Sequence, residues 1–179
     1  MNVPEALKSK ESKLLSIWTE RTLDSYTSSG FFKQSQDQFA NPVGVNIRTG
    51  LTRLFNLIVT EADPQEFVEP LDQIIRIRAV QQFTPAQAVA PILELKWVVK
   101  QVFSADKECR ALLSELAAFD CEVDRAALTA FDLFMQCRDR LHNARIRELK
   151  SGSYILTDSS CASAAIRDNL REISPQTAT

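Results

Sequence analysis

Two arginines are the side chains of this sequence best placed to do chemistry, by binding an anion. Arg76 and Arg78 lie in the segment from Leu71 to Val80, which is apolar nearly all round and is therefore expected to be mostly buried. A buried guanidinium must find carboxylates, other anions or carbonyl oxygens, because an unpaired buried charge is strongly unfavourable. The segment is therefore either held by structural pairing or built to capture a small anionic ligand.

The residues around the two arginines favour structural pairing. Asp72 stands four residues before Arg76, so this pair can close on one helix face. Arg78 takes the place of an apolar residue on the core-facing stripe. Its expected partners are a carboxylate of another helix, such as Glu94, or exposed helix-end carbonyls. Ligand sites usually show several converging polar groups, which makes ligand capture the alternative.

The other reactive side chains form no recognisable catalytic or metal-binding group. His142 is the only histidine, and nothing near it in the sequence resembles a base–nucleophile pair. A haem globin needs a proximal histidine in a middle helix, and the middle helices expected here contain none. The cysteines show neither CxxC nor zinc-site spacing, so we expect buried thiols in a reducing compartment and neither metal, cofactor nor enzymatic activity. These cysteines are Cys109, Cys121, Cys137 and Cys161.

Composition points to a helical protein of the cytoplasm. The net charge is -2 and the pI about 5.5, whereas domains that bind nucleic acid usually carry a clear basic excess. Only four glycines are present, which disfavours a phosphate-binding loop and an all-β chain rich in tight turns. No basic-then-apolar leader and no apolar run of about 20 residues is found, so we expect no membrane insertion.

Three helix starts are marked by a capping residue directly before a proline. The pairs are Asn41-Pro42, Asp63-Pro64 and Thr84-Pro85. In each pair the cap oxygen can accept a backbone N–H, and proline suits the first helical turn because it has no N–H to leave unpaired there. Thr84 has Gln87 three residues on, which completes a capping box.

These starts predict three helices that follow an N-terminal one. The expected ranges are about Pro4–Tyr26, Pro42–Glu61, Pro64–Gln82 and Pro85–Ser104. Pro70 and Pro91 each stand seven residues into their helix, where each should remove a hydrogen bond and bend the axis.

Residues 106–150 contain neither proline nor glycine and predict a short helix followed by a long one that ends at Gly152. Two neighbouring apolar stripes run along the long helix, which is more than one small core needs, so one stripe is expected to face a second subunit. The expected core stripe is Val123, Ala127, Phe131, Phe134 and Leu141. The expected dimer stripe is Leu128, Met135, His142 and Leu149.

The expected architecture is a single all-α domain of about six helices. It spans residues 1–152, and residues 153–179 form a Ser/Thr/Ala-rich, weakly structured tail.

Two motifs carry a resemblance to a known family. They are Phe39-Ala-Asn-Pro-Val-Gly44 and Ile74-Ile-Arg-Ile-Arg-Ala-Val-Gln81, supported by Trp18, Phe83, Pro85, Gln87 and Lys96. Together they closely resemble the RsbRD N-terminal domain, the input region of RsbT co-antagonist proteins of bacterial stress signalling. The resemblance runs from about Ser12 to Phe103 and on to Lys150. The motif residues expected to bind a ligand or to stabilise the fold are Asn41, Pro42, Arg76, Arg78, Gln81 and Gln87.

The resemblance implies a non-haem, globin-like input domain that dimerises and passes signals to a linked output module. Co-antagonists carry a phosphorylatable STAS domain after the input region, but only about 29 residues follow Lys150 here, too few for such a domain. We therefore expect a free-standing sensory or regulatory module that contacts protein partners. The alternative is a protein that binds a small anion near Arg76 and Arg78. Pro91 is foreign to the family helix and puts the geometry there in question.

Overall fold

The computed structural model describes residues 1–26, 30, 32, 41–81 and 83–157. Every regular element among these residues is a helix, which confirms the predicted all-α class. By their internal contacts, residues 1–138 and residues 139–179 form two units. Cys161, the motif residues Phe39 and Ala40, and residues 158–179 of the predicted tail lie outside the described residues.

The predicted N-terminal helix is in fact two helices, α1 (Val3–Ser9) and α2 (Glu11–Asp24), separated at Lys10. An Asn2–Glu5 capping box begins α1. At this break the Lys10 ammonium pairs with the carboxylate of Asp106, a residue distant in the sequence.

The three predicted caps all accept a backbone N–H. Asn41 accepts from the Gly44 N–H at the start of α4 (Pro42–Val59), and Thr84 with Gln87 forms the full capping box of α6 (Pro85–Ala105). Asp63 caps a 3-10 turn, Pro64–Phe67, instead of the predicted long helix. Helix α5 then runs over Val68–Val80.

Pro70 therefore does not break a helix, and that part of the prediction is wrong. Because α5 begins at Val68, Pro70 occupies its third position. The first four N–H groups of a helix have no partner within it, so proline there loses no hydrogen bond. Pro91, by contrast, lies inside α6 as expected.

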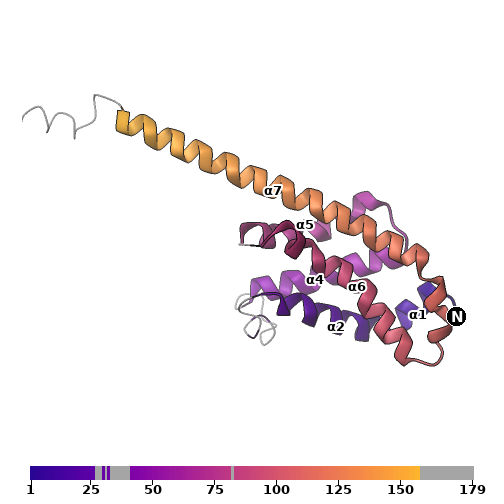
Figure 1. Cartoon of the computed structure of the whole chain (residues 1–179). Coiled ribbons are helices and arrows are strands. Elements are labelled where there is room, and N and C mark those ends of the chain that lie inside the picture. Colours follow the sequence, from indigo (N-terminus) through magenta and orange to yellow (C-terminus); the bar gives the residue numbers. More distant parts are fainter. Residues whose placement is uncertain (27–29, 31, 33–40, 82, 158–179) are drawn as a thin grey trace, which may run out of the picture. The chain divides into compact units, whose positions relative to one another are not determined.

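Helices α2, α4, α5 and α6 form a circuit of neighbours in the first unit (Figure 1). Helix α2 packs on α4, α4 on α5, α5 on α6, and α6 on α2. Helices α4 and α5 approach closely at Gly50, where a Cβ atom would stand 2.8 Å from the Cγ1 of Ile74. Between these helices lies one apolar core that includes Trp18, Leu51, Phe67 and Phe103, all fully buried.

Helix α7 (Ala117–Thr157) follows a 3-10 turn, Arg110–Glu115, that replaces the predicted short helix. Two ion pairs join the first part of α7 to α6, Lys96–Asp124 at 2.6 Å and Lys100–Asp120 at 3.0 Å. The predicted end at Gly152 is wrong. A glycine can cap a helix only where the chain leaves the helical path, and here the helical backbone continues to Thr157.

The Lys10–Asp106 pair yields a pH test of the α1–α2 junction. The Lys10 ammonium and the N–H groups of Cys109 and Glu108 lower the pKa of Asp106 to about 2. A carboxylate with a lowered pKa stabilises the fold above its unfolded pKa near 4, and this contribution is lost as the pH falls towards 2. We expect Asp106→Asn to lower the urea midpoint at pH 7 and to match the wild type near pH 2.

Lys10→Gln is the matched control, because it removes the largest cause of the pKa shift and keeps both backbone hydrogen bonds. Its pH dependence should lie between those of the wild type and Asp106→Asn. A deficit of Asp106→Asn that stays constant from pH 7 to pH 2 would contradict the assignment.

Candidate functional site: a buried arginine and an apolar helix surface

Arg78 is fully buried and connects three helices. It continues the predicted core-facing stripe, which runs from Phe67 of the 3-10 turn through Leu71 and Ile74 of α5, and all four side chains are 0% exposed. Its Nη1 donates to the Ser25 hydroxyl oxygen at 3.0 Å, at the end of α2. Its Nη2 donates to the Gln87 carbonyl oxygen at 2.9 Å, in α6.

Pro91 explains why the Gln87 carbonyl is available. In an unbroken helix the carbonyl of residue 87 accepts from the N–H of residue 91, four positions on. Proline has no N–H, so Pro91 leaves that acceptor without its usual donor. Arg78 supplies the missing donor from another helix.

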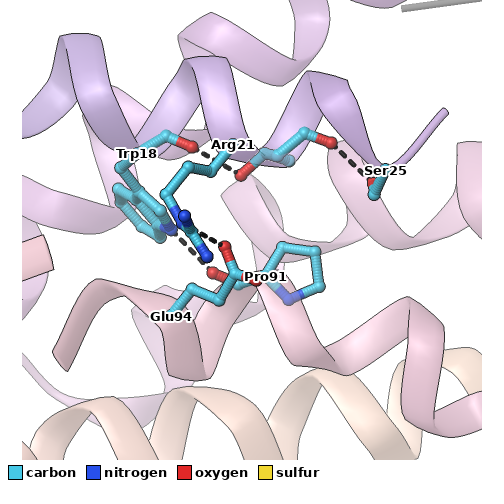
Figure 2. A network of polar contacts seen from close by, with 6 residues as sticks. Trp18, Arg21, Ser25, Pro91 and Glu94 are labelled. Atoms are coloured by element: carbon cyan, nitrogen blue, oxygen red, sulfur yellow. Dashed lines mark hydrogen bonds and ion pairs between the residues drawn. The ribbon is translucent and has the colours of Figure 1, made fainter. Parts of the chain in front are cut away.

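A second side chain, Trp18 of α2, reaches the same stretch of α6. The Trp18 indole Nε1 donates to the Pro91 carbonyl at 2.7 Å in a fully buried contact (Figure 2). Along α2, the Thr22 hydroxyl donates to the Trp18 carbonyl at 2.8 Å, and the Ser25 hydroxyl donates to the Thr22 carbonyl at 2.6 Å. Because Ser25 also accepts from Arg78, these hydrogen bonds form a chain from α5 through α2 to α6.

Aromatic rings cover the guanidinium of Arg78. Its Cζ lies 4.2 Å from the ring centroid of Phe83 and 4.8 Å from that of Tyr26, within the range of a cation–π contact. The two rings meet edge to face at 5.3 Å. Burial raises the pKa of Tyr26, and the positive charge of Arg78 opposes this rise.

The predicted carboxylate partner of Arg78 is wrong. Among the described residues, no acidic side chain lies within ion-pair distance of Arg78. Glu94 instead accepts from Arg21 Nε at 2.9 Å on the surface (Figure 2). The Arg21 guanidinium also lies over the ring of Trp97. The alternative expectation, a carbonyl acceptor, is confirmed, although the carbonyl lies inside a helix and not at its end.

The structure does not bring the two arginines to a common site. Arg76 is 64% exposed and pairs with Asp72, as predicted. Residues two apart on a helix point to different sides, so only Arg78 faces the interior. The remaining motif residues lie at helix ends: Asn41 caps α4 and Pro42 is its first residue, Gln87 completes the capping box of α6, and Gln81 follows the last residue of α5.

An apolar groove lies between α6 and the first part of α7. It is lined by Thr84, Pro85, Ala86, Val89, Ala90, Leu93 and Phe131. Leu93 and Phe131 are both more than 40% exposed, and so is Trp97, one helical turn beyond Leu93. Large apolar side chains exposed together are the usual mark of an interaction surface.

Of the two stripes predicted on α7, the core stripe needs correction. Val123, Ala127 and Phe134 are buried as predicted, but Phe131 is 44% exposed and Leu141 42% exposed. Ala126 and Ala130 are buried in their place, because small side chains let α7 lie close to its neighbours. Periodicity alone did not separate the face that packs from the face beside it.

The predicted dimer stripe is exposed wherever the structure describes it. Leu128 is 69% exposed and Met135 40% exposed in the first unit, and His142 and Leu149 are exposed in the second. The interface itself stays a prediction. Cys109 and Cys137 are buried, as expected of inert thiols, whereas Cys121 is exposed. The described residues contain no cluster of side chains that could hold a metal ion.

Comparison with known proteins identifies one family. The family model described as the RsbT co-antagonist protein rsbRD N-terminal domain matches residues 12–149. No curated protein and no solved structure matches the chain.

The pairing of Arg78 with Pro91 can be tested by a double-mutant cycle. We expect Arg78→Ala to lower the free energy of unfolding by about 3 kcal/mol, because it leaves the Gln87 carbonyl without a donor and opens a cavity. In a Pro91→Ala background the residue 91 N–H can serve that carbonyl, so the same substitution should cost about 1 kcal/mol less. Urea unfolding of the four proteins measures both values.

Arg76→Ala is the matched control on the same helix. Because Arg76 is exposed, its loss should change stability by less than about 1 kcal/mol in both backgrounds. Equal costs of Arg78→Ala with and without Pro91 would show that the two residues are not coupled.

Proposed function

Because the chain belongs to the RsbT co-antagonist rsbRD N-terminal domain family, we propose that it is a cytoplasmic regulatory module of stress signalling that works by contacting other proteins. The observation that carries this proposal is the exposed apolar surface of α6 and α7. Its members are Leu93, Trp97, Leu128, Phe131 and Met135, each at least 40% exposed. We refer to these five residues as the α6–α7 surface.

The composition of the α6–α7 surface suits protein recognition. Trp97 carries the guanidinium of Arg21 over its ring at 4.3 Å, and tryptophan and arginine are enriched among the residues that dominate binding energy. The ion pairs Lys96–Asp124 and Lys100–Asp120 hold α6 against α7 beside these side chains. A surface built on paired helices is more rigid than one on loops, which lowers the entropic cost of binding.

We further propose that one of the partners is a second copy of the chain. Leu128 and Met135 lie seven residues apart on α7 and would be covered by the same helix of another subunit packed across a two-fold axis. His142 and Leu149 continue the seven-residue spacing in the sequence. A symmetric helix pair of this kind would bury apolar side chains that a monomer leaves in water.

Nucleic acid and membrane are not among the proposed partners. The net charge is -2, and association with a polyanion generally needs a basic excess. No helix among the described residues is long and apolar enough to cross a membrane. The proposal assigns no reaction to the protein.

The dimer is tested by light scattering on the intact chain and on Met135→Glu. We expect the wild type to have the mass of two chains at micromolar concentration. The variant should have the mass of one, because it places a buried, unpaired charge in the interface. Gln136→Glu adds the same charge at the next exposed position of α7 and should remain a dimer. A monomeric wild type, or a dimeric Met135→Glu, would overturn the proposed interface.

Partner contact is tested separately by using the chain as bait in a native lysate. We expect a specific signalling protein to be captured by the wild type and lost with Trp97→Ala, which removes an exposed anchor without disturbing the core. Lys13→Ala, an exposed position on α2 outside the α6–α7 surface, should capture the same protein. Capture that is unchanged by Trp97→Ala would place the partner site elsewhere.

A further inference from the structure

The guanidinium of Arg78 retains hydrogen-bonding capacity that no described residue uses. An arginine side chain has five N–H donors, and here two of its nitrogens donate, to Ser25 and to Gln87. The third nitrogen, Nε, is buried and has no hydrogen-bond partner. Buried donors in native proteins are nearly always paired, so an unpaired one calls for a physical explanation.

A second unpaired polar atom belongs to a side chain in contact with the same guanidinium. The Tyr26 ring lies 4.8 Å from Arg78 Cζ. Arg78 interacts with the Tyr26 hydroxyl and opposes the rise in its pKa that burial causes, but the buried hydroxyl makes no hydrogen bond of ordinary length and angle. Two donors with unused capacity, one on a cation and one on a neutral hydroxyl, therefore belong to neighbouring side chains. One small acceptor could satisfy both.

The charge of Arg78 restricts which acceptor that can be. The two groups that accept from Arg78, a hydroxyl and a carbonyl, are neutral, and the rings of Tyr26 and Phe83 are neutral as well. A buried cation is stabilised most by one opposite charge, whereas a dianion would leave a net negative charge in the same place. A monovalent anion therefore fits the site better than a phosphate dianion.

The residues that contact the Arg78 guanidinium differ in their exposure. Arg78 is 0% exposed, but Ser25, which accepts its Nη1, is an exposed residue, and Phe83 over its face is only partly buried. Of the two rings over the guanidinium, Phe83 is the less buried, so an entering ligand would have to displace that ring.

We propose that Arg78 and the Tyr26 hydroxyl together bind a small monocarboxylate, of acetate size, where the end of α2 meets the start of α6. One carboxylate oxygen accepts from Arg78 Nε and the other from Tyr26, and the apolar part of the ligand packs on Phe83. Arg76 takes no part, because it is exposed and already paired with Asp72. This inference stands independently of the α6–α7 surface and of the oligomeric state.

The probe for this site is sodium acetate, compared with sodium chloride at equal ionic strength and pH. We expect acetate to raise the Tm saturably, by about 3–6 °C at ten times its Kd, as follows from binding to the folded state alone. In the 1H–15N spectrum the Arg78 Nε–H resonance should shift along the same titration. Chloride should produce neither effect.

Three variants assign the effect to the proposed atoms. Tyr26→Phe keeps the ring and removes the hydroxyl, so it should weaken acetate binding at least tenfold, and Arg78→Met should abolish it. Arg76→Met is the matched control and should bind acetate like the wild type. If Arg78→Met does not fold, Tyr26→Phe and the Nε–H titration of the wild type still decide the question.

Several results would overturn the proposal. An equal response to chloride would indicate an adventitious ion only. No response of either Tm or the Arg78 Nε–H resonance to acetate would mean that a buried water satisfies these atoms. Undiminished binding in Tyr26→Phe, or lost binding in Arg76→Met, would place acetate at a different site.

Discussion

A helix carbonyl that has lost its donor is the constraint around which this helix packing is arranged. Pro91 interrupts the hydrogen-bond ladder of α6 at Gln87, in a helix whose inner face is otherwise apolar. The donor comes from Arg78 on α5, and the next part of the same stretch is held by Trp18 from α2. Each contact joins helices distant in sequence, so the three helices must approach in one register for both hydrogen bonds to form.

The cost of this arrangement is a positive charge enclosed in the core. Arg78 has neutral hydrogen-bond acceptors and two ring faces around it, but none of the described carboxylates. Burying a cation costs several kcal/mol that such partners offset only in part. An apolar residue at position 78 would avoid this cost but leave the Gln87 carbonyl unpaired. An anion bound as proposed would neutralise a charge that the unbound core already contains.

The inner and outer faces of α6 and α7 have different roles. The inner faces supply Ile92, Val99, Val123 and Phe134 to the core, and the ion pairs to Asp120 and Asp124 fix the two helices beside one another. The outer faces keep the α6–α7 surface exposed. Because the helices are anchored from within, the proposed partner would bind to this surface without rearranging the core. Anion binding at Arg78 and protein binding at α6–α7 would therefore use separate side chains.

The sequence by itself determined the helical class, the starts of α4 and α6, and the burial of Arg78. All of these follow from local chemistry, namely a capping oxygen before a proline, and from an apolar period that includes position 78. Pro91, expected inside a helix, also indicated a carbonyl without its usual donor. Because a helical N–H donates to the carbonyl four residues earlier, that carbonyl could have been placed at Gln87 from the sequence. The family motifs gave the same family that the comparison found over residues 12–149.

Only the tertiary structure decided which groups satisfy Arg78, where the N-terminal helix divides, and which face of α7 is buried. Glu94 was expected to pair with Arg78 because of its charge, but it forms its ion pair with Arg21 on the surface. The division at Lys10 coincides with an ion pair to Asp106, nearly a hundred residues later in the sequence. Phe131 was expected in the core but is exposed, and its neighbour Ala130 is buried, because the fit of neighbouring helices, and not hydrophobicity alone, selects the side that packs. Such choices depend on atoms brought together from distant parts of the chain, which local patterns do not encode.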